Sequence, residues 1–266
     1  MNRHPPIKGG VNFRDFGGYD TADGGKVKWR KLFRSGHLAG LTDDDHTHLD
    51  GMDLGVICDF RTDWENEREP ARLPAHLGSR VVRFNIWPKS ARTVNRMIKA
   101  LDSGQATEAE IYESQNVVYR EFVVEFSDKY AAMFRHILDG QGRAVLIHCA
   151  GGKDRTGLGA ALLHSALGVP EDTIHEDYIL TNRGENLTQF LRDLAEKNVS
   201  QNGAIPNDDI ETVFNRFMRL FGARTDSLRA AFEAIHDMAG SVEGYVRDVL
   251  KVSDSDKAKL RSWFVE

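Results

Sequence analysis

Short apolar runs alternate along the chain with longer stretches in which apolar residues recur at helical spacing. The apolar runs cover residues 55–60, 81–86 and 144–147. Their length and their polar or turn-forming flanks are typical of buried strands. Thr107 and Glu110 form a capping box ahead of a helical pattern that ends at Gly140, and Thr42 and Gly51 bound a shorter helix. Apolar strands separated by helices predict an α/β fold with a mostly parallel central sheet flanked by helices.

Glycines mark two further elements. Gly24 and Gly25 predict a turn that leads into a hairpin formed by residues 27–29 and 32–34. After Gly157, a run of small apolar residues predicts a buried helix that stops at Gly168.

The last third of the chain has a helical pattern to its end. Helix N-caps are expected at Asn207, Thr225, Ser241 and Ser253. We predict a single domain over residues 1–266 with a helical C-terminal part. The polar stretch 89–116 is predicted to be a helical lid or insertion, and the loop 201–206 is a second candidate.

Composition and charge exclude several classes of function. The chain is 41% hydrophobic and 28% charged, and its net charge of -5 gives no overall attraction to nucleic acid or to anionic membranes. No segment approaches the roughly 18 consecutive apolar residues of a membrane span, and the N-terminus lacks the apolar core of a signal peptide. Two cysteines, Cys58 and Cys149, form no disulfide framework. We therefore expect a cytoplasmic protein. Export by a route that needs no cleaved signal is the alternative.

One predicted strand-to-helix turn gathers the residues that bind and attack a phosphate. It reads His148-Cys149-Ala150-Gly151-Gly152-Lys153-Asp154-Arg155-Thr156-Gly157. The two glycines allow successive N–H groups, from Ala150 to Arg155, to point at one anion, and the helix N-terminus adds to this positive potential. Arg155 offers a bidentate fork to two phosphoryl oxygens, and Lys153 is a second candidate contact. The alternative for Lys153 is a side chain in solvent.

The same positive potential stabilises a thiolate at Cys149, which we expect to be the nucleophile. Thr156 is expected to donate a hydrogen bond to the sulfur, and His148 to orient the loop from behind. The alternative is a buried structural cysteine beside a glycine-rich turn. A nucleotide-binding loop does not fit, because Asp154 and not Ser or Thr follows Lys153. We expect neither a metal nor a cofactor.

The loop resembles the Cys-x5-Arg loop of cysteine-dependent tyrosine and dual-specificity phosphatases. It is most similar to the bacterial and fungal branch with a Lys-Asp-Arg loop, which includes triple-specificity phosphatases of phosphotyrosine, phosphoserine/threonine and phosphoinositides. Further matching motifs are Asn12–Tyr19, Leu32–Gly36, and Asp59–Thr62 with Glu65. The resemblance implies hydrolysis of phosphoric monoesters through a cysteinyl-phosphate, with a phosphorylated protein or a phosphoinositide as substrate and inorganic phosphate as product.

The position of the general acid departs from the usual family pattern. Conventional members carry this acid as the Asp of a Trp-Pro-Asp loop, but here Trp87-Pro88 is followed by Lys89. The resemblance to the Lys-Asp-Arg branch therefore assigns the acid to Asp154. A structural carboxylate at Asp154, with Asp63 or Asp59 as the acid, is the alternative.

Several other residues are candidates for supporting roles. Arg14, Asp15 and Arg61, and similarly Arg34, are expected to buttress the catalytic loop, with local ion pairs as the alternative. In the candidate lid, one face of a predicted helix is basic and is formed by Arg92, Arg96 and Lys99. This face is either a solvated surface or a contact for an anionic headgroup. Cys58 is a buried filler or a partner for a reversible disulfide with Cys149.

The sequence favours hydrolysis over other classes of function. His46 and His48 lie two positions apart and so point to different helix faces, which predicts no metal site. A phosphate-binding pseudoenzyme would usually lose the nucleophile or the acid, whereas this chain keeps Cys149, Asp154 and Arg155. An arsenate reductase or a rhodanese could also use a cysteine loop, but the flanking motifs favour a phosphatase.

Overall fold

A computed structural model describes residues 2–93, 96, 104–183, 188–189, 192 and 222–266. Its centre is a five-stranded sheet with the order β1-β2-β5-β3-β4. The strands are β1 (Arg14–Asp15), β2 (Leu32–Ser35), β3 (Leu54–Asp59), β4 (Val81–Arg83) and β5 (Ala144–His148). Only the β1–β2 pairing is antiparallel, whereas β2, β5, β3 and β4 run parallel. This arrangement confirms the predicted fold class.

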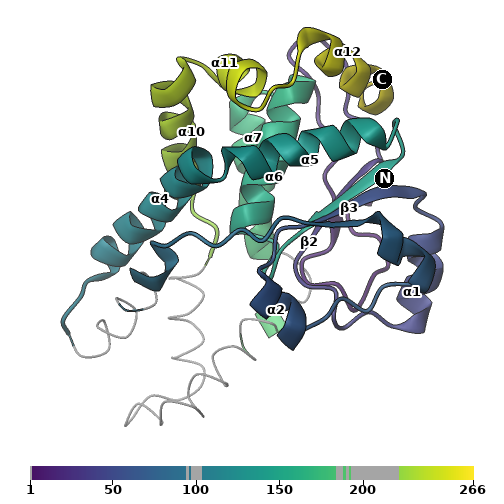
Figure 1. Cartoon of the computed structure of the whole chain (residues 1–266), viewed down its shortest axis with the longest axis horizontal. Coiled ribbons are helices and arrows are strands. Elements are labelled where there is room, and N and C mark those ends of the chain that lie inside the picture. The colour runs from purple at the N-terminus through teal and green to yellow at the C-terminus, as the bar shows by residue number, and fades with distance from the viewer. Residues whose placement is uncertain (1, 94–95, 97–103, 184–187, 190–191, 193–221) are drawn as a thin grey trace.

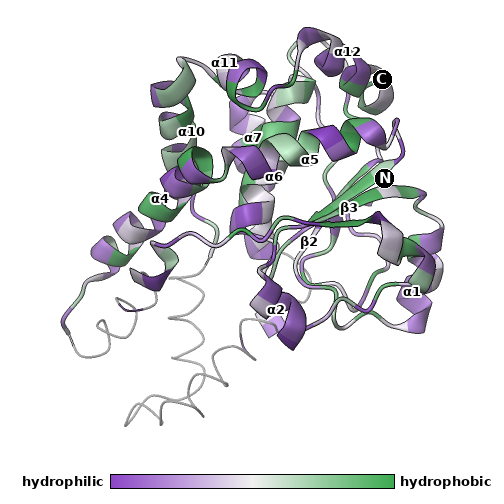
Figure 2. Cartoon of the chain, in the orientation of Figure 1, coloured by the Kyte–Doolittle hydropathy of each residue, from purple (hydrophilic) through white to green (hydrophobic). Residues whose placement is uncertain are grey.

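Alternate residues of the parallel strands face two different layers. Phe33, Ile57 and Leu146 belong to a smaller apolar cluster on the side of the sheet that α1 (Asp43–Asp50) covers. Cys58 and Ile147 belong to the larger cluster on the opposite side. Figure 2 shows the strands as a hydrophobic band between these layers, with the more hydrophilic α1 and α2 on the outside.

The larger layer contains most of the helices (Figure 1). These are α4 (Glu108–Glu125), α5 (Ser127–Asp139), α6 (Asp154–Leu167), α7 (Glu171–Ile179), α10 (Thr225–Ala239), α11 (Val242–Gly244) and α12 (Asp254–Phe264). The remaining elements are α2 (Asp63–Arg68), η1 (Ala75–Arg80), η2 (Leu180–Arg183) and η3 (Tyr245–Val249). Helices α4 and α10 pack side by side, so the C-terminal part joins the layer that covers the sheet. In the described part of the chain, no helix is long and apolar enough to cross a bilayer.

Most of the helix ends that the sequence predicts are confirmed. Capping boxes begin α1 at Thr42, α4 at Thr107 and α12 at Ser253, and the hydroxyl of Ser241 caps α11. Gly168 ends α6 in the left-handed conformation, at φ 90°. Thr225 was expected to cap α10, but the N-cap is Arg224 and Thr225 is the first helical residue. Asn207, the loop 201–206 and Lys99 lie outside the described residues.

Three predicted elements are wrong in their partners or length. The apolar run 81–86 forms a strand only over Val81–Arg83, which is β4. Residues 27–29 do not form a hairpin with β2, because Val27 bridges Val265 near the C-terminus and β2 pairs with β1. The helical pattern that ends at Gly140 is two helices, since the backbone at Phe126 (φ -121°, ψ 17°) breaks the first before α5 begins. The candidate lid 89–116 includes the first half of α4, and its residues 94–95 and 97–103 lie outside the described part.

Candidate active site

The predicted phosphate-binding loop connects β5 to α6 at the carboxyl edge of the parallel strands. His148, the last residue of β5, pairs with Ser35 of β2 and with Asp59 of β3, so the three strands end together. Cys149 follows directly and is only 2% exposed. Helix α6 begins at Asp154, and the N–H groups of its first turn have no intrahelical acceptor. The fold therefore places Cys149 at a strand end opposite a helix N-terminus, as open α/β folds place their ligands.

The backbone of the loop lies directly on the segment that follows β2. Gly152 has φ 67°, and a Cβ at this position would lie 2.5 Å from the nitrogen of Gly36. A Cβ at Gly36 would lie 2.6 Å from the carbonyl oxygen of Ala150, and the N–H of His37 donates to that oxygen at 2.7 Å. These two glycines are required by the close approach of two backbones. The Leu32–Gly36 motif thus supports the loop from below.

Arg155 is oriented by a carboxylate from α2. Its Nη1 and Nη2 donate to the two oxygens of Glu65, each at 2.7 Å, and Nη1 also donates to the carbonyl oxygens of Phe60 and Ile86. Among the described residues, these contacts leave Nε–H and the second N–H of Nη2 as the edge available to two phosphoryl oxygens. Arg155 is thus held as a fork whose outer edge can bind a phosphate.

The charges around Arg155 keep it protonated. Burial alone would lower the pKa of Arg155, but Glu65, Cys149 and Asp154 raise it above its ordinary value. Burial likewise opposes ionisation of Glu65, and the hydrogen bonds and charge of Arg155 lower the pKa of this carboxyl. The pair is therefore ionised at neutral pH.

A second ion pair holds the loop from the opposite side. Arg34 donates to Asp177 of α7 at 2.6 Å and to the carbonyl oxygen of Gly152 at 3.2 Å. The amide of Asn12 donates to the same carbonyl at 3.2 Å, and Arg14 donates to Asn12 at 2.6 Å. The predicted supporting residues Arg14 and Arg34 thus lie beneath the loop.

The group beneath the loop formed by Arg14, Arg34 and Asp177 carries more positive than negative charge. Burial and the neighbouring Arg34 lower the pKa of Arg14 to about 9. Burial alone would raise the pKa of Asp177, but Arg34 and Arg14 lower it to about 2. Two guanidinium groups therefore share one carboxylate, which leaves a net cation under a loop that we expect to bind an anion.

Arg61 and His148 form a separate buried group with Asp59. Arg61 makes charge-assisted hydrogen bonds to both Asp59 oxygens and donates to Asn66 at 2.6 Å. The Nε2 of His148 lies 3.7 Å from Asp59. Burial lowers the pKa of His148 to about 4 despite the attraction of Asp59, so the ring is neutral at pH 7. Asp59 is thus engaged in fixing the chain behind the loop.

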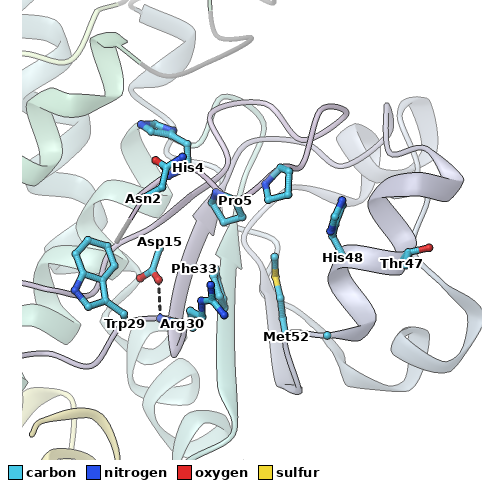
Figure 3. A pocket seen from close by; sticks show the side chains of 12 residues that line it. Asn2, His4, Pro5, Asp15, Trp29, Arg30, Phe33, Thr47, His48 and Met52 are labelled. Carbon is cyan, nitrogen blue, oxygen red and sulfur yellow. Dashed lines mark hydrogen bonds between the residues drawn. The ribbon is translucent and has the colours of Figure 1, made fainter.

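Thr156 and Asp15 have hydrogen-bond partners outside the loop. The Thr156 hydroxyl lies 3.5 Å from the carbonyl oxygen of Ser35, and its predicted hydrogen bond to Cys149 stays a prediction. Asp15 accepts from the N–H groups of Gly17 and Arg30 and lines a cavity of about 480 Å³ between the N-terminal segment and α1 (Figure 3). Its role near the loop also stays a prediction.

Asp154 lines a smaller cavity beside the loop. This cavity, of about 200 Å³, is lined by Trp87, Pro88, Ala91, Gln115, Val118, Tyr119, Phe122, Lys153, Asp154 and Arg155. The Asp154 side chain is 40% exposed, and its Oδ1 accepts from the Tyr119 hydroxyl at 2.7 Å and lies 3.2 Å from Lys153 Nζ. An acid and a guanidinium fork thus meet below mostly apolar walls.

The other candidate acids have different surroundings. Asp63 exchanges hydrogen bonds with Asn85 at the surface. Lys89, at the position of the usual family acid, is exposed, and its backbone N–H donates to Glu121 of α4. This contact ties the segment after Trp87 to α4.

Comparison with known proteins agrees with this geometry. The model of a tyrosine phosphatase family matches residues 5–266. The chain belongs to this tyrosine phosphatase family. It is 29% identical over 262 residues to a protein of Cupriavidus necator provisionally named a tyrosine-protein phosphatase, covering 96% of this chain and 85% of that one. It is 27% identical over 260 residues to the triple specificity protein phosphatase PtpB of Mycobacterium tuberculosis, covering 91% and 92%.

Family membership confirms the enzyme class that the loop predicted, a protein tyrosine phosphatase. Three residues of the site were not predicted: Glu65 as the partner of Arg155, Asp177 as the partner of Arg34, and Tyr119 as the partner of Asp154. A signal was present only for Glu65, which follows Thr62 at capping-box spacing within a matching motif.

Cys58 lies on β3, next to the strand that ends just before Cys149. It pairs with Ile147, two residues before Cys149, and belongs to the same apolar cluster. Burial and the neighbouring Asp59 raise its pKa, so it is a thiol at neutral pH. A reversible disulfide with Cys149 stays a prediction.

Proposed function

We propose that this phosphatase hydrolyses phosphotyrosine through a covalent intermediate on Cys149. The observation that carries the proposal is the Glu65–Arg155 pair, in which two 2.7 Å hydrogen bonds fix the guanidinium beside a nucleophile at a strand end. Because Glu65 already holds this partly buried arginine in one position, its side chain loses little entropy when it binds a phosphate dianion.

The reaction proceeds in two displacements at phosphorus. The amides from Ala150 to Arg155 and the outer edge of Arg155 bind the phosphoryl oxygens. The Cys149 thiolate attacks phosphorus, the ester P–O bond breaks, and Asp154 gives its proton to the departing oxygen. Water then attacks the cysteinyl-phosphate, Asp154 takes up a proton, and the thiolate leaves with release of inorganic phosphate.

The cavity above Asp154 supports an aromatic leaving group. Trp87, Val118 and Phe122 contribute apolar walls, and Trp87 is 40% exposed at its rim. The phenyl ring of phosphotyrosine can pack against these walls while its phosphate reaches the loop. Because one relative is named a triple specificity phosphatase, phosphoserine, phosphothreonine and phosphoinositides belong in the same substrate panel, where Lys153 would be the contact for additional negative charge.

Trapping the intermediate tests the proposal. Wild type should hydrolyse p-nitrophenyl phosphate and a phosphotyrosine peptide in the presence of EDTA, and acid quenching during turnover should give protein phosphorylated at Cys149 by mass spectrometry. Cys149→Ser should bind the phosphopeptide without turning it over. Loss of activity in EDTA, or turnover by Cys149→Ser close to that of wild type, would contradict the mechanism.

A further inference from the structure

Asp154 is held by two buried tyrosines from different helices. Tyr119 of α4 and Tyr178 of α7 are both 1% exposed. The Tyr119 hydroxyl donates to Asp154 Oδ1 at 2.7 Å and lies 2.5 Å from the Tyr178 hydroxyl. The three polar groups therefore form a continuous chain from the interior of the helical layer to the cavity that Asp154 lines.

The direction of hydrogen bonding along this chain follows from the protonation of the tyrosines. Burial and the negative charge of Asp154 raise the pKa of both Tyr119 and Tyr178 well above the ordinary value, so both remain phenols. Tyr119 uses its only proton to donate to Asp154. Its oxygen therefore accepts from Tyr178, and the polarised hydroxyl of Tyr119 is a stronger donor to the carboxylate.

The loop itself leaves room for this arrangement at Gly157. A Cβ at this position would lie 2.9 Å from two ring atoms of Tyr178. The last glycine of the catalytic loop thus allows the Tyr178 ring to pack directly on the first turn of α6. This contact brings the Tyr178 hydroxyl to Tyr119.

We propose that Tyr119, supported by Tyr178, is a positioning residue that fixes Asp154 so that Oδ1 accepts hydrogen bonds and Oδ2 carries the catalytic proton. The proposal rests on the proposed function, in which Asp154 is the general acid. Tyr119 and Lys153 both approach Oδ1, so, among the described residues, Oδ2 is the oxygen left to donate. A hydrogen bond to a carboxylate is stronger than one to a carboxylic acid. Tyr119 therefore favours transfer of the proton to the leaving group.

The test uses aryl phosphates whose leaving groups differ in basicity. Tyr119→Phe should lower kcat for phenyl phosphate by about 10-fold, whereas kcat for p-nitrophenyl phosphate, whose leaving group needs little protonation, should change by less than about 3-fold. The descending limb of the kcat/KM profile should move to higher pH, because loss of the donor makes the carboxylate easier to protonate. Tyr178→Phe should give a smaller change in the same direction.

A matched control separates positioning from general loss of stability. Tyr245 is also buried, and its hydroxyl donates to the Val123 carbonyl at 2.8 Å. Tyr245→Phe should cost a similar amount of stability and leave the dependence on leaving group unchanged. Equal loss of kcat for both substrates in Tyr119→Phe, with an unmoved pH profile, would overturn the proposal.

Asp154→Asn distinguishes failure of this proposal from failure of the proposed function. It should lower kcat for phenyl phosphate by about 10²–10⁴-fold and p-nitrophenyl phosphate less. Adding Tyr119→Phe to Asp154→Asn should have little further effect, because both changes act on one proton transfer. If Asp154→Asn shows no dependence on leaving group, the acid assignment is wrong. If Asp154→Asn shows this dependence but the double variant loses kcat by the product of the two single losses, Tyr119 acts independently of Asp154 and the positioning role is wrong.

Discussion

Arg155 and Arg34 approach the catalytic loop from opposite sides, and each is paired with one carboxylate. The Arg155–Glu65 pair faces the cavity, with side chains 11% and 15% exposed. The Arg34–Asp177 pair lies beneath the loop, with side chains 1% and 2% exposed. The two closest contacts have nearly the same length, 2.7 and 2.6 Å. What differs is where the remaining donors of each guanidinium are used.

This difference assigns the two pairs to separate tasks. In the proposed function, the remaining edge of Arg155 binds the phosphate, so its binding energy is realised when the phosphate arrives and during its transfer. Arg34 donates a hydrogen bond to the Gly152 carbonyl, so it fixes the backbone of the loop before any ligand binds. Loss of the Arg155–Glu65 pair should affect turnover more than stability. Loss of the Arg34–Asp177 pair should affect stability more than turnover.

Among changes to these two pairs, the largest effect should come from Arg155→Lys. Lysine keeps the charge but cannot form the fork to Glu65 and the phosphate together, and removal of one oriented donor in an active site typically costs about 10²–10³-fold in kcat. We expect kcat/KM for p-nitrophenyl phosphate to fall by at least this factor, with unfolding in urea little changed. A variant within about 10-fold of wild type would show that the fork is not the catalytic clamp.

Asp177→Asn should have the second largest effect, on stability. It leaves two buried guanidinium groups without their carboxylate, and breaking a buried pair in this way costs about 3–5 kcal/mol. The measurement is the free energy of unfolding in urea. The matched control is Asp43→Asn, which removes an exposed partner of Arg72 at 3.0 Å and should cost less than about 1 kcal/mol. Equal losses in the two variants would remove the distinction between the two sides of the loop.

The same comparison shows what the sequence could predict of the site. Cys149, Asp154 and Arg155 lie in one turn, so the sequence could predict a role for each of them from a local pattern. Their partners are distant: Glu65 is 90 residues from Arg155, and Asp177 is 143 residues from Arg34. Hydrophobic periodicity contains no information on which distant charges meet, because that depends on how helices pack on the sheet.

In the fold too, local elements could be predicted from the sequence and distant contacts could not. The strands β3 and β5 and the capped helices were predictable because apolar runs and caps act over a few residues. Val27 was assigned to a hairpin, but it pairs with Val265 at the other end of the chain. A glycine pair can predict a turn, but it cannot predict that Val27 bridges a residue of the C-terminal segment.

The smallest predicted effect is the pH dependence of the stability that the Arg34–Asp177 pair contributes. The pKa of Asp177 is about 2 in the folded protein, below its ordinary value of 3.8. Its stabilising contribution is therefore complete above the unfolded pKa and is lost as the pH falls toward the folded pKa, because the unfolded chain binds the proton first. The difference in unfolding free energy between wild type and Asp177→Asn should thus shrink by about 1 kcal/mol between about pH 6 and about pH 3. Urea denaturation of both proteins across this range measures it. A difference that stays constant would mean that Asp177 is not the ionised partner of Arg34, and the contrast with the Arg155–Glu65 pair would then rest on exposure alone.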